Sequence, residues 1–155
     1  MNRKNFLSQI VTTVAAAALT PNLISCEQRQ RQKIRGLKNW AGNYTYQADE
    51  VRYPQDKVSL SKLLKSHSKV KALGTQHCFN DIADTSGMQL STKNLNSIIE
   101  LNQGLSYVIV ESGIKYGDLA NQLHNNGWAL HNLASLPHIS VGGSCATATH
   151  ESGIR

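Results

Sequence analysis

Residues 135–150 read SLPHISVGGSCATATH, and residues 142–149 within them form a run of eight without a bulky side chain. Such a run lets the backbone approach a large ligand closely and offers N–H and hydroxyl donors to it. The same composition also fits a tightly packed helix or turn against a sheet, and composition alone does not separate the two. The sequence therefore marks this run as a candidate binding segment.

A second candidate is LGTQHCFN, residues 73–80, which follows a short apolar run at residues 70–73. A glycine turn after a strand presents successive backbone N–H groups, which suits an anionic phosphate. The segment is not a Walker loop, because no Gly-Lys-Ser/Thr follows, and it is not the G-x-G-x-x-G fingerprint. Judged by spacing alone, His77 is more often a solvated or capping residue.

Three segments occur in one order: NWAGN at residues 39–43, GTQHCFN at residues 74–80 and SLPHISVGGS at residues 135–144. Together they resemble the FAD-linked oxidases of the vanillyl-alcohol-oxidase superfamily, with PCMH-type FAD-binding domains. The nearest likeness is to alditol (xylitol or sorbitol) oxidases and aldonolactone oxidases. The resemblance implies an α+β fold that forms the N-terminal portion of such a domain. It also implies FAD as cofactor and a polyol or sugar lactone as substrate, oxidised at a CH–OH group with electrons passing to dioxygen or another acceptor.

The resemblance assigns roles to individual residues. His77 matches the histidine that these oxidases link covalently to the flavin 8α-methyl carbon, and Ser135 falls where a hydroxyl lies near the substrate. The matching FAD-contacting positions are Ala72, Leu73, Gly74, Thr75, Gln76, His77 and Cys78 in the first segment, and Ser140, Gly143, Ser144, Cys145 and Ala146 in the second.

The phosphate loop departs from the family pattern Gly-Ser-Gly-His-Ser at two positions. Gln76 replaces the glycine before the histidine, and Cys78 replaces the serine after it. A Cβ at position 76 is expected to hinder tight approach of a phosphate.

The family's FAD domain continues beyond this sequence and a substrate-cap domain follows, so the resemblance implies an N-terminal fragment. The groups that act on substrate belong to the later part, and no catalytic residue is assigned in this chain. We expect residues 1–155 alone to bind FAD weakly or not at all and to turn over no polyol. The alternatives are a non-catalytic lipoprotein that binds a small polar ligand through the same loops, which would be colourless, and a truncated, non-functional product.

Local patterns predict short strands mixed with helices, which indicates an α+β architecture. Asp56 is the expected N-cap of a helix with apolar residues Val58, Leu60, Leu63 and Leu64, and Gly127 is the expected stop of a helix over residues 116–126. The expected strands are residues 51–54, 70–73, 88–91, 98–101, 107–111 and 128–133, the fourth and fifth of which form a hairpin.

The domain organisation is predicted as an export signal at residues 1–26, a polar linker at 27–38 and an incomplete FAD-binding domain at 39–155. Residues 10–19 are apolar but too short to span a bilayer, and LISC at 23–26 resembles a lipobox that ends on an acylated Cys26. This predicts an exported, periplasmic or cell-envelope lipoprotein held to the membrane by its lipid. An ordinary cleaved signal with a chance cysteine is the alternative. RKNFL at residues 3–7 also resembles the twin-arginine export motif, with Lys in place of the second Arg.

The charge distribution argues against nucleic acid as a partner. The net charge is +6, and residues 1–40 account for all of it with seven basic residues and one acidic residue, whereas residues 41–155 carry nine of each. A nucleic-acid footprint needs a basic face on the folded part.

The six histidines show no metal-ligand spacing, so no metal site is predicted. Cys78 and Cys145 are expected to be buried free thiols, with a disulfide between them as the alternative.

Overall fold

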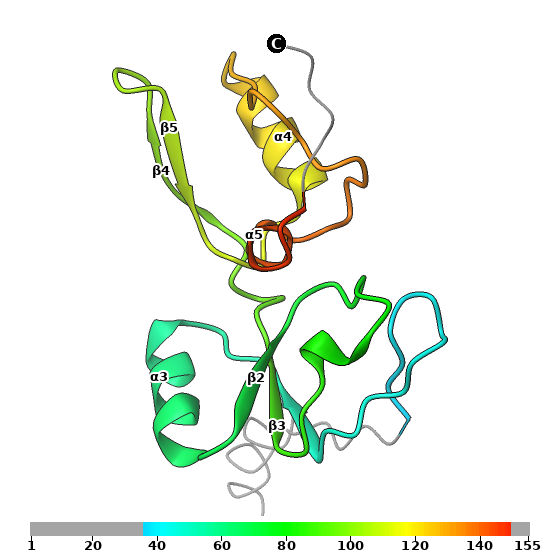
Figure 1. Cartoon of the computed structure of the whole chain (residues 1–155). Coiled ribbons are helices and arrows are strands. Elements are labelled where there is room, and N and C mark those ends of the chain that lie inside the picture. Colours follow the sequence, from blue (N-terminus) through cyan, green and yellow to red (C-terminus); the bar gives the residue numbers. More distant parts are fainter. Residues whose placement is uncertain (1–35, 150–155) are drawn as a thin grey trace, which may run out of the picture. The chain divides into compact units, whose positions relative to one another are not determined.

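A three-stranded parallel sheet forms the first part of the structure, a computed structural model that describes residues 36–149. Its strands are β1 (Glu50–Arg52), β2 (Val70–Leu73) and β3 (Met88–Ser91), and β3 lies in the middle (Figure 1). Helix α3 (Lys57–Ser66) connects β1 to β2, and the short 3₁₀ helix η1 (Asp81–Ala83) precedes β3. Because both strand pairs are parallel, the carboxyl ends of all three strands meet at one edge of the sheet.

Helix α3 begins at the predicted cap. The Ser59 N–H donates to Asp56 Oδ1 at 2.7 Å and the Asp56 N–H donates to Ser59 Oγ at 3.2 Å, which makes a reciprocal capping box. The apolar face expected for this helix is less buried than its pattern predicts. None of its residues is fully buried, and the Val58 side chain is 79% exposed.

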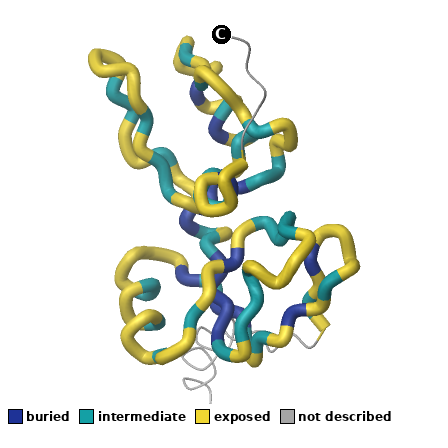
Figure 2. Tube along the Cα trace, in the orientation of Figure 1, coloured by how far each residue is buried: buried dark blue, intermediate teal, exposed yellow. Residues whose placement is uncertain are grey.

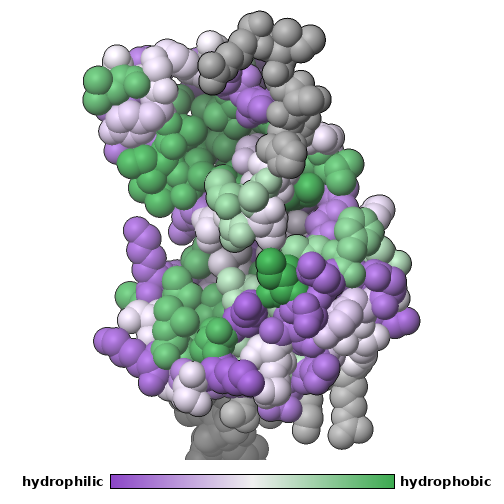
Figure 3. Space-filling view, in the orientation of Figure 1, coloured by the Kyte–Doolittle hydropathy of each residue, from purple (hydrophilic) through white to green (hydrophobic). Residues whose placement is uncertain are grey.

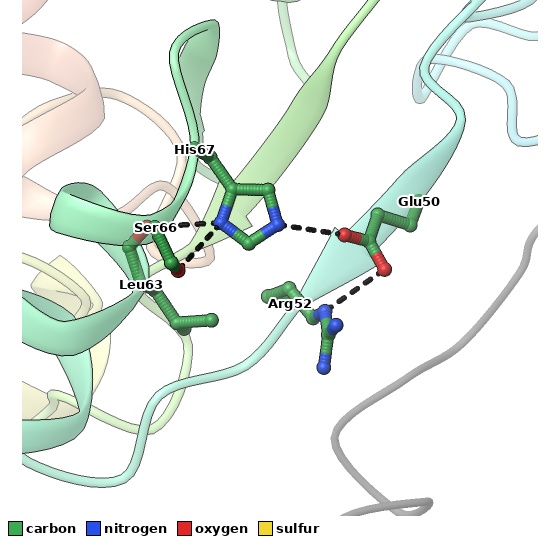
Figure 4. Close-up of polar contacts among 5 residues, drawn as sticks. All are labelled: Glu50, Arg52, Leu63, Ser66 and His67. Atoms are coloured by element: carbon green, nitrogen blue, oxygen red, sulfur yellow. Dashed lines mark hydrogen bonds and ion pairs between the residues drawn. The ribbon is translucent and has the colours of Figure 1, made fainter.

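A polar cluster joins the end of α3 to β1 (Figure 4). Glu50 accepts hydrogen bonds from Arg52 Nε at 2.9 Å and meets His67 Nε2 at 3.1 Å, so its two carboxylate oxygens serve different partners. His67 Nδ1 lies 3.0 Å from the Leu63 carbonyl oxygen of the last turn of α3. The buried Arg52 charge therefore has a carboxylate partner, as burial of a charge requires.

The second part combines a hairpin with two helices. Strands β4 (Ile98–Asn102) and β5 (Tyr107–Val110) pair antiparallel, and α4 (Tyr116–Asn125) and α5 (Val141–Ala146) follow. Its core is formed by Ile114, Leu119 and Leu123, and Figure 2 shows how few segments of the described chain are fully buried. The mixture of short strands and helices confirms the predicted α+β class.

The end of α4 explains why the strand expected at residues 128–133 does not form. The Trp128 N–H donates to the Leu123 carbonyl and the Gly127 N–H to the His124 carbonyl, both at 2.9 Å, and Gly127 has φ +77°. These are the two bonds of a Schellman motif, in which glycine takes the left-handed conformation. Trp128 thus closes the helix and packs on the Leu123 core, so the strand prediction was wrong.

The outer face of the hairpin is apolar. Ile99, Tyr107 and Ile109 are exposed on the strands and Leu105 is exposed in the turn between them, and Figure 3 shows hydrophobic surface in the region of the hairpin. Since Val108 and Val110 pack on the core of the other face, β5 is apolar on both of its faces. This is the pattern of a strand buried between two layers.

Both cysteines of the described residues are free, so the disulfide alternative is wrong. Cys78 is half-buried, but Cys145 is exposed because α5 turns it outward, which corrects the expectation of two buried thiols. No helix among residues 36–149 is long and apolar enough to cross a membrane. The predicted export signal, the acylated Cys26 and most of the linker lie outside the described residues.

Candidate functional site

A cleft of about 500 Å³ opens at the carboxyl ends of the three parallel strands. Tyr53 follows β1, Gly74 follows β2 and Thr92 follows β3, and all three residues line it. Ligands of open parallel sheets bind at this edge, because the chain leaves each strand there in a loop. The other lining residues are Leu73, Thr75, Gln76, Ser91, Lys93, Asn94, Asn96, Gly113, Lys115, Asp118, His138 and Ser140.

The loop after β2 presents unused backbone donors. The N–H groups of residues 75–78 donate no hydrogen bond to any described residue. Gln76 has φ +64°, a left-handed conformation that residues with a Cβ adopt rarely. A left-handed residue within a turn is how successive N–H groups converge on an anion. The positive φ at position 76 also explains why a glycine suits this position in the family pattern.

The NWAGN segment holds this loop in place. The Trp40 N–H donates to the Gln76 carbonyl at 2.8 Å, and buried Asn39 Nδ2 donates to the Cys78 carbonyl at 3.0 Å. Asn43 Nδ2 reaches the Phe79 carbonyl at 3.2 Å. Three carbonyl groups of the loop are therefore bonded by residues 39–43, while no residue in the described range 36–149 accepts from the N–H groups of residues 75–78.

Ser140 lies where the two predicted segments meet. Its Oγ is buried and has no hydrogen-bond partner among the described residues. A Cβ added at Gly74 would lie 3.1 Å from this Oγ, and one added at Gly143 would lie 2.8 Å from it. Both glycines thus leave room around a hydroxyl group that needs a partner, since an unsatisfied buried hydroxyl is costly.

His77 stacks on Trp40 and meets a second histidine. The ring centroids of His77 and Trp40 are 4.5 Å apart at an interplanar angle of 20°. His77 Nε2 lies 2.6 Å from His138 Nε2, so one ring must donate a hydrogen to the other. Partial burial lowers the pKa of His77 below its ordinary value, and repulsion from His138 lowers it further.

The structure brings together only part of the predicted FAD-contacting set. Leu73, Gly74, Thr75, Gln76 and Ser140 line the cleft, although the Leu73 side chain itself belongs to the core. Ala72, on β2, is exposed, and its side chain is not part of the lining.

Of the second predicted FAD-contacting segment, only some residues lie near the cleft. Gly143 lies beside Ser140, but Ser144 Oγ is bonded elsewhere, at 2.9 Å from the Val141 carbonyl and 3.0 Å from Tyr116 Oη. Cys145 and Ala146 are exposed on α5 and do not line the cleft. Ser135 is exposed on the loop before α5 and is likewise outside the lining.

Several charged or titratable residues at the site were not predicted from the sequence, among them Lys93, Lys115, Asp118 and His138. Lys93 and Lys115 both line the cleft, and nothing in their local sequence places them there. His138 stood inside the SLPHISVGGS segment but received no role, because it lacks metal-ligand spacing. Its contact with His77, 61 residues away, is set by the tertiary fold.

The family described as FAD binding domain matches residues 49–155, and this chain belongs to that family. The match confirms the resemblance drawn from the three segments. In fold, residues of this chain superimpose on cholesterol oxidase from Brevibacterium sterolicum with a TM-score of 0.65 at 17% identity, covering 79% of this chain and 25% of that one.

Two oxidases are also similar in sequence. The alditol oxidase of a Streptomyces species is 41% identical over 121 residues, which are 76% of this chain and 29% of that protein. The L-gulonolactone oxidase of Mus musculus is 32% identical over 125 residues, 77% of this chain and 28% of that protein. This chain therefore spans less than a third of the length of these relatives.

Proposed function

We propose that the cleft, together with the loop after β2 that carries His77, binds FAD in an oxidoreductase that oxidises the CH–OH group of a polyol or sugar lactone. The observation that carries the proposal is a set of donors that have no partner among the described residues. They are the Ser140 hydroxyl and the N–H groups of residues 75–78, of which residues 75 and 76 line the cleft. The substrate class rests on the names of the similar alditol and L-gulonolactone oxidases.

The residues present fit the diphosphate of FAD. The free N–H groups would bind its oxygens, as backbone donors do in phosphate-binding loops, and the Ser140 hydroxyl would add a donor. Lys93 and Lys115 would balance its charge, whereas Asp118, which also lines the cleft, would repel it. Gly74 and Gly143 keep the space between the two segments free of side chains.

FAD, when bound, accepts the hydride equivalent that a carbinol carbon gives up. In this proposal His77 is the residue through which the cofactor is attached covalently. Ser135, exposed on the loop before α5, binds a substrate hydroxyl. Cys26 is the acylated anchor of an exported protein, in the periplasm or at the cell envelope, which places the site outside the cytoplasm.

An NMR titration of the chain with millimolar FAD tests the cofactor site, because it detects weak binding. We expect backbone shifts at residues 74–78 and 140–143, and their loss in Gly74→Val, whose side chain would enter the space beside Ser140. Gly104→Val is the matched control, since a Cβ there meets nothing closer than 3.7 Å. Shifts confined to other regions, or equal shifts in Gly74→Val, would contradict the proposal.

A further inference from the structure

Three rings from three distant segments form one cluster. Trp40 comes from the NWAGN turn, His77 from the loop after β2, and His138 from the loop before α5. The His77 and His138 centroids are 4.7 Å apart, and Trp40 also lies over His138 at 6.4 Å. The cluster therefore fixes the orientation of the His77 ring from two sides.

The contact between the two histidines has a chemical consequence. At 2.6 Å, only one hydrogen fits between the two Nε2 atoms, so one nitrogen carries it and the other offers a lone pair. The ring that donates through Nε2 keeps a lone pair on Nδ1 when it is neutral. The ring that accepts carries its hydrogen on Nδ1 instead. The pair therefore couples the tautomer of each ring to that of the other.

The backbone on both sides of His77 is held as well. Trp40 N–H bonds the Gln76 carbonyl, and Asn39 Nδ2 bonds the Cys78 carbonyl. No described residue makes a hydrogen bond to His77 Nδ1. Nε2 of His77 is therefore bonded to His138, while Nδ1 has no partner among the described residues. The contacts with Trp40 and His138 restrict rotation of the ring.

We propose that His138 is a positioning residue that accepts the Nε2–H of His77 and so holds His77 in the tautomer with a free Nδ1 lone pair. The tautomer itself follows from the contact between the two rings, whereas its role rests on the proposed function. That role is to leave a neutral nucleophilic nitrogen available where the cofactor would be attached. A flexible, solvated histidine would share its hydrogen between both nitrogens, and part of its population would be unable to react.

Nitrogen-15 NMR of the imidazole rings in the full chain tests the tautomer without any cofactor. At a pH where the pair is neutral, we expect His77 to show a protonated Nε2 and an unprotonated Nδ1. His138→Gln keeps a hydrogen-bond acceptor and should retain this pattern. His138→Leu keeps bulk but not the acceptor, and should give a mixture of both His77 tautomers. His124→Gln, at an exposed position of α4, is the control and should change nothing at His77.

Several results would overturn the proposal. One is an unchanged His77 pattern in His138→Leu, because packing alone would then select the tautomer. Another is a His138→Gln variant no different from the Leu variant. Free-histidine shifts at His77 in the wild-type chain would also overturn it, since no pair would exist. The FAD titration of the same samples reports separately on the proposed function, so a chain with the predicted tautomer whose FAD-induced shifts lie away from residues 74–78 and 140–143 would refute the function alone.

Discussion

Alanine substitutions at the neighbouring glycines Gly142 and Gly143 should have different effects. The first should lower the free energy of unfolding, and the second should weaken the binding of FAD. Both residues lie in α5, where glycine-to-alanine substitution favours the helix by about 1 kcal/mol. A Cβ at Gly142 would lie 2.7 Å from Ser112 Cβ and 2.9 Å from its carbonyl oxygen. These atoms can move only with the backbone, so overpacking of about 1–3 kcal/mol outweighs the helix gain.

Gly143 differs because its added Cβ would meet only Ser140 Oγ, at 2.8 Å. A hydroxyl can rotate away, so we expect Gly143→Ala to keep or raise the free energy of unfolding, by up to about 1 kcal/mol. The rotation takes the hydroxyl out of the cleft. Losing one hydrogen bond of about 1 kcal/mol should weaken FAD binding about fivefold.

Urea unfolding and FAD titration, on both variants and the wild type, measure the two effects. Gly142→Ala should unfold at lower urea than Gly143→Ala. The reasoning is refuted if Gly142→Ala is the more stable of the two, or if Gly143→Ala binds FAD as tightly as the wild type.

Three further changes have defined outcomes. Gln76→Gly should raise the free energy of unfolding by up to about 1 kcal/mol in urea titrations, because glycine relieves the left-handed strain at φ +64°, whereas the exposed Gln103→Gly should not. His77→Gln should flatten the dependence of stability on pH. The unfolded chain binds more protons between the lowered pKa of His77 and the ordinary 6.5, so wild-type stability rises with pH across that window, and the contribution of His77 is constant below it. Identical slopes of the two proteins in urea titrations at several pH values would argue against this. Radiolabelled palmitate should enter the wild-type chain in a bacterial host but not Cys26→Ala, and equal labelling would exclude acylation at Cys26.

Local signals were enough to predict several elements. Strands β2 and β3 have the bounds that their apolar runs predict, and the caps at Asp56 and Gly127 are where the sequence places them. Each of these features depends on contacts within a few residues. The strand prediction for residues 128–133 was wrong because Trp128 takes part in the cap of helix α4. The alternation of apolar and polar residues does not reveal this capping bond.

The site was predictable only where a motif marked it. The glycine loop and the SLPHISVGGS segment pointed to Gly74, His77 and Ser140, but the order β1-β3-β2 decides which loops share an edge with them. That order brings Tyr53 and Lys93 to the cleft from separate strands. The turn before α4 adds Lys115, whose neighbours in sequence carry no sign of a ligand.

The central claim is that this chain contributes a binding site for FAD, with His77 as its attachment point. The most direct measurement is flavin fluorescence on a denaturing gel. The sample is this chain followed by the part of the Streptomyces alditol oxidase that lies beyond the matched region. We expect a fluorescent band at the size of the chimera, and in His77→Ala a folded yellow protein whose flavin is lost on denaturation. A folded chimera without flavin would contradict the binding site, and a fluorescent band that persists in His77→Ala would contradict the attachment point.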